Sequence, residues 1–304
     1  MRFGLQIETY QPGEAGNEFD TMLAVARLAE EVGFTSVWYE DHFMWRDDAR
    51  PETPSPQLEC LMTLAALASA TTRIELGMLV LGVPYRNPAL VAKMCATLDV
   101  ISHGRAIVGL GAAWHEQEFD AFGWPFGTVG ERMERLEEAV QIIDRMLTTR
   151  PASFAGKHYR IDRTLNDPPS VRQPRPPILI AGNGERRTLR LVARYADMCN
   201  VYGSVDEVRR KFAILREHCA TEGRPYEAVT RTINYWCLLA GDEGERRTKA
   251  ARFPEAAIET PDEMIAALRE YAEAGTQYTI VKILDAGDLE PVRAFARTVL
   301  PAFG

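Results

Sequence analysis

Short runs of β-branched and aromatic residues alternate with amphipathic helical stretches along almost the whole chain. A return to a neighbouring parallel strand needs a crossover of many residues, usually a helix, so this alternation favours a parallel sheet covered by helices. The first unit shows the pattern. Residues 3–7 predict a strand, Asn17 begins a helix with one apolar face, and Gly33 ends it.

Strands are predicted at residues 3–7, 36–39, 74–80, 106–110, 178–181, 198–201, 231–239 and 279–283. Helices between or after them are predicted at residues 17–32, 60–70, 87–101, 129–148, 185–196, 205–222, 260–274 and 289–300. Eight strands that are each followed by a helix, in 304 residues, match a closed (β/α)8 TIM barrel better than an open sheet. We therefore expect one barrel domain over residues 1–304, with residues 149–176 as an insertion.

The charge and composition limit the classes of partner. A formal charge of -8 and an isoelectric point near 5.3 argue against nucleic-acid binding, which needs a broad basic face. The five cysteines show no CxxC spacing, which indicates reduced thiols rather than disulfides or zinc. The chain passes from Met1-Arg2 straight into a predicted strand, and no apolar run is long enough to span a bilayer. We expect a cytoplasmic protein without membrane contact.

Catalytic groups of such barrels come from the carboxyl ends of the strands, so position selects candidates before residue type does. Glu8, Asp41, His42, Trp114 and Asn183 stand at these ends. His42 could exchange a proton near neutral pH, although a histidine that only makes structural hydrogen bonds at the rim is the plain alternative. Neighbouring side chains on a strand point in different directions, so Asp41 and His42 do not predict a metal site.

The glycines Gly182 and Gly184 flank Asn183 between a predicted strand and a predicted helix. Such a turn can direct backbone amides and a helix N-terminus at a phosphate group. A plain turn is the alternative, and the motif lacks the lysine of a P-loop.

Five segments together resemble a known family. They are MRFGLQI, AEEVGFTSVWYEDHF, RIELGMLVLGVPYRNPALVAKMCATLDVISHGR, GLGAAWHEQEFDAFG and PPILIAGNGERRTLRLVARYADMCN. In this order and spacing they are similar to the bacterial luciferase-like oxidoreductases, and within them to the branch that uses the deazaflavin coenzyme F420. The resemblance covers nearly the whole chain, and its most specific part is residues 73–105.

The resemblance implies a bulge at the end of the third strand, with a non-proline cis peptide between Leu79 and Val80 that backs the middle ring of the cofactor. It also implies that His42 lies beside the reactive ring carbon, where it contacts the ring or moves a proton. The cofactor-binding residues that it implies are Leu79, Val80, Trp114, Gln117, Gly182, Asn183 and Gly184.

We therefore expect an oxidoreductase that transfers a hydride between coenzyme F420 and a small organic substrate, and the resemblance implies a homodimer. Three alternatives stay open at this point. They are an FMN-dependent luciferase-like monooxygenase, a flavin- or deazaflavin-binding barrel without turnover, and a metal-dependent barrel hydrolase. Fold alone does not choose between them.

Overall fold

A computed structural model describes residues 1–9, 16–44, 56–254 and 256–304. Its centre is a sheet of eight main strands that pair in the order β1, β2, β3, β5, β8, β9, β10 and β12. Each of these pairs is parallel, and β12 pairs with β1, from Arg2 opposite Tyr278 onward. The sheet therefore closes into the predicted α/β TIM barrel.

The eight barrel strands are β1 (Arg2–Ile7), β2 (Ser36–Tyr39), β3 (Glu75–Met78), β5 (Ala106–Gly111), β8 (Ile178–Ala181), β9 (Met198–Val201), β10 (Thr230–Leu239) and β12 (Tyr278–Ile283). The helices are α1 (Glu18–Val32), α2 (Cys60–Ala70), α3 (Pro88–Ile101), α4 (Glu116–Phe122), α5 (Val129–Thr148), α6 (Thr188–Tyr195), α7 (Val205–Thr221), α8 (Glu243–Arg252), α9 (Pro261–Glu273) and α10 (Glu290–Thr298). The shorter strands are β4 (Leu81–Gly82), β6 (Ala152–Ala155), β7 (Arg160–Thr164) and β11 (Ile258–Glu259).

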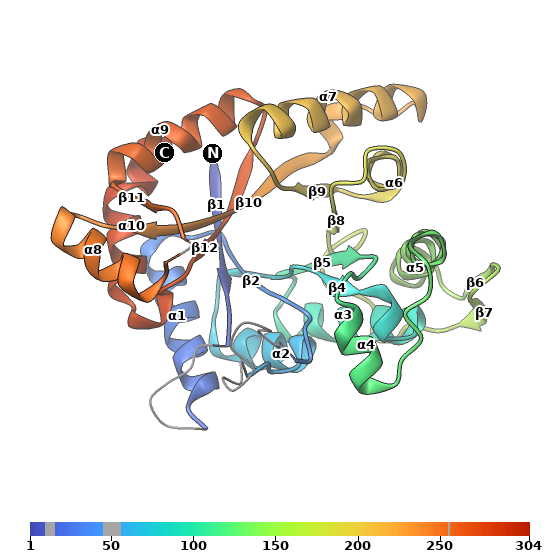
Figure 1. Cartoon of the computed structure of the whole chain (residues 1–304). Coiled ribbons are helices and arrows are strands. Elements are labelled where there is room, and N and C mark those ends of the chain that lie inside the picture. Colours follow the sequence, from blue (N-terminus) through green and yellow to red (C-terminus); the bar gives the residue numbers. More distant parts are fainter. Residues whose placement is uncertain (10–15, 45–55, 255) are drawn as a thin grey trace.

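Helices surround the strands (Figure 1), and apolar side chains are buried on both faces of the sheet. The larger cluster lies between the strands and the helices. A smaller cluster gathers Trp38, Ile107, Leu179, Met198, Tyr278 and Ile280. A Cβ atom on Gly77 would lie 2.2 Å from the Trp38 ring, so glycine at this position of β3 lets the indole pack against the strand.

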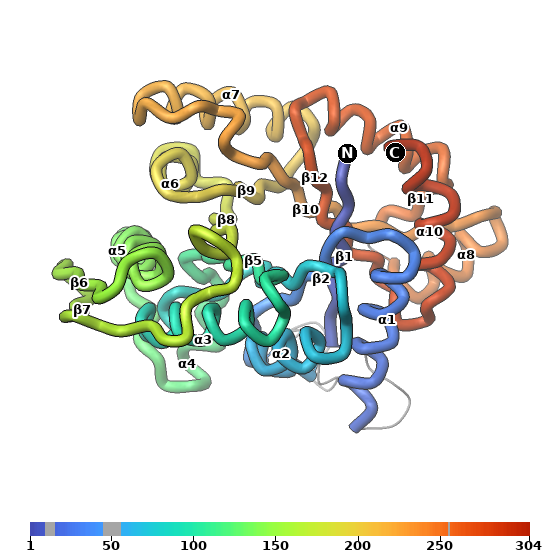
Figure 2. The backbone as a smooth tube through the Cα atoms, turned by 180° about the vertical axis from the view of Figure 1, so that it is seen from behind, coloured from blue at the N-terminus to red at the C-terminus, as the bar shows by residue number. Residues whose placement is uncertain are grey.

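The two chain ends lie close together, as Figures 1 and 2 show from opposite sides. The amino group of Met1 donates a hydrogen bond of 3.2 Å to the carbonyl oxygen of Phe303. The predicted insertion contains an antiparallel pair, β6 and β7, which lies beside α5 on the outside of the barrel (Figure 2). This hairpin adds no strand to the barrel wall.

Several predicted elements agree with the structure to the residue, among them the second strand and the helices at 60–70 and 129–148. One predicted helix was wrong in part, because the helix predicted from residue 185 begins at Thr188. Two helices, α4 and α8, were not predicted. Within the described ranges, no helix has both the length and the apolar composition that spanning a bilayer requires.

The third strand is broken where the resemblance implied a bulge. It was predicted as one run over residues 74–80, but β3 ends at Met78 and β4 begins at Leu81. The peptide between Leu79 and Val80 is cis, as predicted. A Cβ atom on Gly109 would lie 1.8 Å from the Met78 carbonyl oxygen, so only glycine allows β5 to approach this bulge so closely.

Candidate active site

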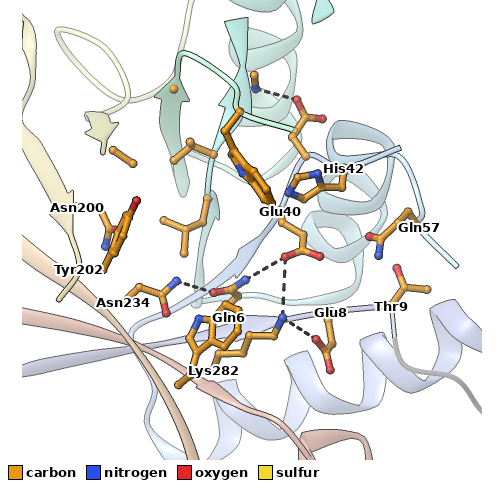
Figure 3. Close-up of a pocket in the computed structure, with 18 of the residues that line it drawn as sticks. Gln6, Glu8, Thr9, Glu40, His42, Gln57, Asn200, Tyr202, Asn234 and Lys282 are labelled. Carbon is orange, nitrogen blue, oxygen red and sulfur yellow. Dashed lines mark hydrogen bonds and ion pairs between the residues drawn. The ribbon is translucent and has the colours of Figure 1, made fainter. Parts of the chain in front are cut away.

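A cavity of about 1390 Å³ opens at the carboxyl ends of the barrel strands. Of the residues predicted to form the site, His42, Leu79, Val80, Trp114 and Gly182 line it together. Three others lie outside its lining: Gln117 on the exposed face of α4, and Asn183 and Gly184 in the turn before α6. The polar side chains that face the cavity are drawn in Figure 3.

His42 is held by a carboxylate from a distant part of the chain. Glu118, on α4, lies 2.9 Å from the Nδ1 atom of His42 and is fully buried. The carboxylate also accepts hydrogen bonds from the backbone N–H groups of Phe43 (2.6 Å) and Met44 (3.1 Å), and from the hydroxyl of Tyr85 (2.7 Å). These four donors leave Glu118 little freedom to move.

The short helix α4 explains why Glu118 reaches this position. It begins after His115 and ends at Gly123, which has the left-handed conformation that favours glycine. Glu118 and Phe119 are its buried residues. The Phe119 ring stacks on the Tyr85 ring, with 4.7 Å between their centroids, so the same helix turn positions both the carboxylate and one of its donors.

Burial and hydrogen bonding oppose each other in the pKa of Glu118. Burial raises it, but the hydrogen bonds from His42, Tyr85 and Met44 outweigh burial and lower the pKa to about 2. The carboxylate is therefore ionised and can only accept, so Nδ1 of His42 carries the shared proton. Burial lowers the pKa of His42, but Glu118, Glu40 and Asp41 raise it above its usual value overall.

Asp41 points away from His42 and fixes the rim between β2 and the bulge. Its carboxylate pairs with both terminal nitrogens of Arg86, at 2.7 and 2.9 Å. It also accepts a hydrogen bond of 3.0 Å from the backbone N–H of Gly82. Arg86 is shared with Glu59. This arrangement agrees with the expectation that Asp41 and His42 diverge, and it gives Asp41 a structural part.

A second group of polar side chains lines the cavity, and we call it the polar wall: Gln6, Glu8, Glu40, Asn234 and Lys282. The Nζ atom of Lys282 is 2.7 Å from Glu8 and 4.0 Å from Glu40. Gln6 donates to Glu40 (3.3 Å) and accepts from Asn234 (2.8 Å). Figure 3 shows these side chains linked in one chain, with Glu40 nearest to His42.

The turn before α6 forms another edge of the cavity. Gly182 adopts a φ of +130° and, with Thr188, lines the cavity. Asn183 instead bonds to the backbone of Tyr202, donating to its carbonyl oxygen (2.8 Å) and accepting from its N–H (3.1 Å). The side chain of Asn183 therefore ties this turn to the end of β9.

Sequence reasoning named His42 but missed the residues that position it. Glu118 lies inside the quoted segment GLGAAWHEQEFDAFG, which holds two other glutamates or glutamines. The available signal was the position of Glu118 beside the apolar Phe119 and four residues before Phe122. Gln6, Glu40 and Lys282 stand at or next to the ends of predicted strands, and Asn234 lies within one, but they match no motif.

Within the described ranges, no three histidine, cysteine, aspartate or glutamate side chains gather as metal ligands. The five cysteines are buried, and none forms a disulfide with another.

Curated relatives match parts of the chain. An F420-dependent glucose-6-phosphate dehydrogenase of Kineococcus radiotolerans is 36% identical over 232 residues, which are 74% of this chain and 64% of the relative. One of Amycolatopsis mediterranei is 34% identical over 58% of this chain and 50% of its own length. An F420-dependent hydroxymycolic acid dehydrogenase of Mycobacterium tuberculosis is 29% identical over 80% and 66%. The chain thus spans about half to two thirds of these relatives.

Solved structures share the fold over the whole chain. The monooxygenase RslO1 from Streptomyces bottropensis superposes with a TM-score of 0.85 at 26% identity, covering 100% of both chains. An F420-dependent secondary alcohol dehydrogenase in complex with an F420-acetone adduct has a TM-score of 0.83 at 20% identity, covering 100% and 99%. The model of the luciferase-like monooxygenase family matches residues 1–281. With this match and this barrel, the chain belongs to the luciferase-like monooxygenase family.

Proposed function

We propose that this protein is an oxidoreductase that transfers a hydride between coenzyme F420 and a small organic substrate, with His42 as the catalytic residue. The observation that carries the proposal is the pairing of His42 with the buried, ionised Glu118 at the mouth of a large cavity. Relatives that are named F420-dependent dehydrogenases support the choice of cofactor.

The residues of the cavity fit a flat cofactor together with a substrate. Ligand cavities in proteins usually measure about 300–1,000 Å³, so about 1390 Å³ leaves room for both. Glycine at 109 and 111 allows the Leu79–Val80 bulge to lie against β5, because a Cβ atom at either position would meet the bulge. The bulge then offers an apolar edge to a ring system.

The proposed cofactor contacts follow the family resemblance. The residues are Leu79, Val80, Trp114, Gln117, Gly182, Asn183 and Gly184. For the phosphate end, the cavity is lined by Gly182 in the turn before α6 and by Thr188, the first residue of α6. Backbone N–H groups in the first turn of a helix lack partners within the helix. We infer that Asn183 acts there by holding the turn against Tyr202.

When bound, the deazaflavin accepts or donates the hydride at carbon five of its ring. The role of the protein in this reaction is to move the proton that accompanies the hydride. Because Glu118 holds the Nδ1 proton of His42, Nε2 is the atom that exchanges a proton with the substrate oxygen. In oxidation an alcohol loses its C–H hydride and gives its hydroxyl proton to Nε2, and in reduction both steps reverse.

Two measurements test this function. Titration of the apoprotein should show binding of coenzyme F420, and the His42→Ala variant should transfer hydride at least about a hundredfold more slowly while its affinity for the cofactor stays within a few fold. An unchanged rate with several substrates would remove His42 from the reaction. Asn166→Ala, at a residue outside the cavity lining, is the matched control for general damage.

A second candidate is an FMN-dependent monooxygenase on the same scaffold. Its support is the 26% identity to the monooxygenase RslO1 over the whole chain. Tight FMN binding without F420 binding, together with oxygen consumption by the reduced enzyme, would favour this candidate. A barrel that binds either cofactor without turnover would show binding and no hydride transfer.

The remaining proposals concern the organisation of the protein. We infer a single barrel domain over residues 1–304, a cytoplasmic location and a homodimer, as the sequence and the resemblance imply. Light scattering of the purified protein should give twice the chain mass, and a monomer would contradict the dimer.

A further inference from the structure

We propose that the polar wall (Gln6, Glu8, Glu40, Asn234 and Lys282) is the substrate-specificity site, and that it binds the hydroxyl groups of an uncharged polyhydroxylated substrate. This proposal rests on the proposed function, because it concerns the substrate of the same cavity. It adds the chemical class of the substrate, which neither the family match nor His42 identifies.

The first argument is the orientation of two amides. The carboxylate of Glu40 accepts from Gln6 at 3.3 Å, which makes the contacting atom the Nε2 donor of Gln6. The Oε1 atom of Gln6 therefore faces Asn234, whose Nδ2 donates to it at 2.8 Å. This leaves Oδ1 of Asn234 buried, with no hydrogen-bond partner in the described part of the chain. A buried carbonyl oxygen without a donor is costly, so a ligand that brings a donor is favoured.

A second acceptor lines the same cavity. Oε1 of Gln57 is buried and has no hydrogen-bond partner among the residues that the structure describes. With Glu8 and Glu40, the cavity thus offers several oxygen acceptors. A substrate that matches them must carry several hydrogen-bond donors.

The charged side chains of the cavity limit which functional groups of a substrate can bind there. The lysine and the arginine that line the cavity within the described ranges both have carboxylate partners, Lys282 with Glu8 at 2.7 Å and Arg252 with Asp288 at 2.8 Å. A phosphate or carboxylate on the substrate would compete with these carboxylates for the two cations. The two carboxylates of the wall already share the ammonium group of Lys282, so an ammonium group on the substrate would compete with Lys282 for them. Hydroxyl groups both donate and accept, so they match the acceptors and the lysine together.

An aromatic side chain beside the wall suits the carbon skeleton of such a substrate. Trp236 lines the cavity and is 62% exposed, and Nζ of Lys282 lies 4.9 Å from its ring centroid. An exposed indole offers a flat apolar surface that the C–H bonds of a ring-shaped polyol can cover. The wall would then bind hydroxyl groups while Trp236 contacts the carbon atoms.

Calorimetric titration of the cofactor-loaded protein tests this class with four probes: glucose, glucose 6-phosphate, glucosamine and cyclohexanol. We expect glucose to bind at least about tenfold more tightly than each of the others, since one hydrogen bond to a charged acceptor contributes about that much. Equal binding of cyclohexanol, tighter binding of the phosphate or the amine, or no glucose binding would overturn the proposal.

The variant Asn234→Leu tests the wall itself, because leucine keeps the volume and removes the unmatched oxygen. Glucose binding should weaken about tenfold, and cyclohexanol binding should stay unchanged, which shows that the cavity is still folded. Glu8→Gln is a milder second variant with the same expected direction. Arg297→Gln, on an exposed ion pair of α10, is the matched control. Unchanged glucose binding in both wall variants would overturn the proposal.

The same titrations separate the failure of this inference from the failure of the proposed function. Glucose binding to the apoprotein can be measured even if coenzyme F420 does not bind, so the wall is tested without turnover. If F420 binds and is reduced by alcohols but glucose is not preferred, only the polyol proposal fails.

Discussion

The two sides of the cavity differ in how completely their polar atoms are paired. On the side of β2 and α4, the Glu118 carboxylate takes four donors from the protein itself. On the side of β10 and β12, Oδ1 of Asn234 is buried with no hydrogen-bond partner among the described residues, and Lys282 is shared by two carboxylates. The Glu118 carboxylate on the first side has its hydrogen-bond partners within the protein, whereas the Asn234 oxygen on the second side has none in the described chain.

This difference indicates a division of labour. A side chain that must hold a proton in one place gains from partners that restrict it, because a misplaced proton carrier slows the reaction. A site that must recognise hydroxyl groups gains from acceptors that only the substrate satisfies. Substitutions on the first side should therefore cost stability, and those on the second side should cost binding.

The largest expected effect is the loss of the buried carboxylate. Glu118→Leu leaves the donors of Phe43, Met44 and Tyr85 without their acceptor, so we expect the free energy of unfolding to fall by about 3–5 kcal/mol. Urea unfolding followed by circular dichroism measures this loss. Glu31→Leu, at an exposed ion pair of α1, should change it by less than about 0.5 kcal/mol. A loss below about 1 kcal/mol in Glu118→Leu, which is roughly the cost of a change at the surface, would remove the contrast between the two sides.

A smaller loss of stability is expected from a substitution in β5, the strand that packs against the Leu79–Val80 bulge. The added methyl group of Gly109→Ala would meet the Met78 carbonyl at 1.8 Å and Val80 at 3.1 Å, and the backbone must shift. We expect about 1–3 kcal/mol of destabilisation and weaker cofactor binding. Gly130→Ala is the matched control, because it lies in α5 with its nearest neighbour at 3.7 Å. It should be neutral or stabilising by up to about 1 kcal/mol, and equal losses in the two variants would contradict the steric argument.

The pH dependence of stability sharpens the same contrast. The pKa of Glu118 is lowered to about 2, so its contribution is present above its usual value of 4.5 and is lost as the pH falls toward 2. The pKa of His42 is raised, so its contribution is present below the usual 6.5 and is lost as the pH rises through the folded value. Each group changes stability by at most about 1.4 kcal/mol per pH unit.

Urea titrations of the parent and of Glu118→Gln should therefore differ most near pH 5 to 6, between the two usual pKa values of about 4.5 and 6.5. The difference should shrink toward acid and toward alkaline pH. A difference that stays constant across the range would mean that the pair does not titrate as described.

Much of the barrel was predictable because its signals are local. Asn87-Pro88 and Thr260-Pro261 start helices through their own side chains, and the structure has both helices at these positions. Asn17 also precedes a helix, but its side chain makes no capping hydrogen bond. Helix starts could therefore be read from a few neighbouring residues, even where the predicted cap is not formed.

The site was predictable only in part because its contacts are not local. His42 and Glu118 are 76 positions apart, and Gln6 and Asn234 are 228 apart. No spacing along the chain could connect these pairs without the closed barrel. The family resemblance supplied the position of the bulge and of His42, while the polar wall carries no shared motif. The long loop between the second strand and the following helix falls largely at residues 45–55, outside the described residues.

The smallest effect on stability is expected on the unpaired side. Asn234→Leu removes one hydrogen bond to Gln6, but it also removes a buried oxygen that lacks a partner in the described chain. These two changes oppose each other, so the free energy of unfolding should change by less than about 1 kcal/mol. The same urea titration measures it beside Glu118→Leu. A loss as large as that of Glu118→Leu would mean that the polar wall stabilises the fold. The buried Oδ1 atom of Asn234 would then not indicate a substrate-binding site.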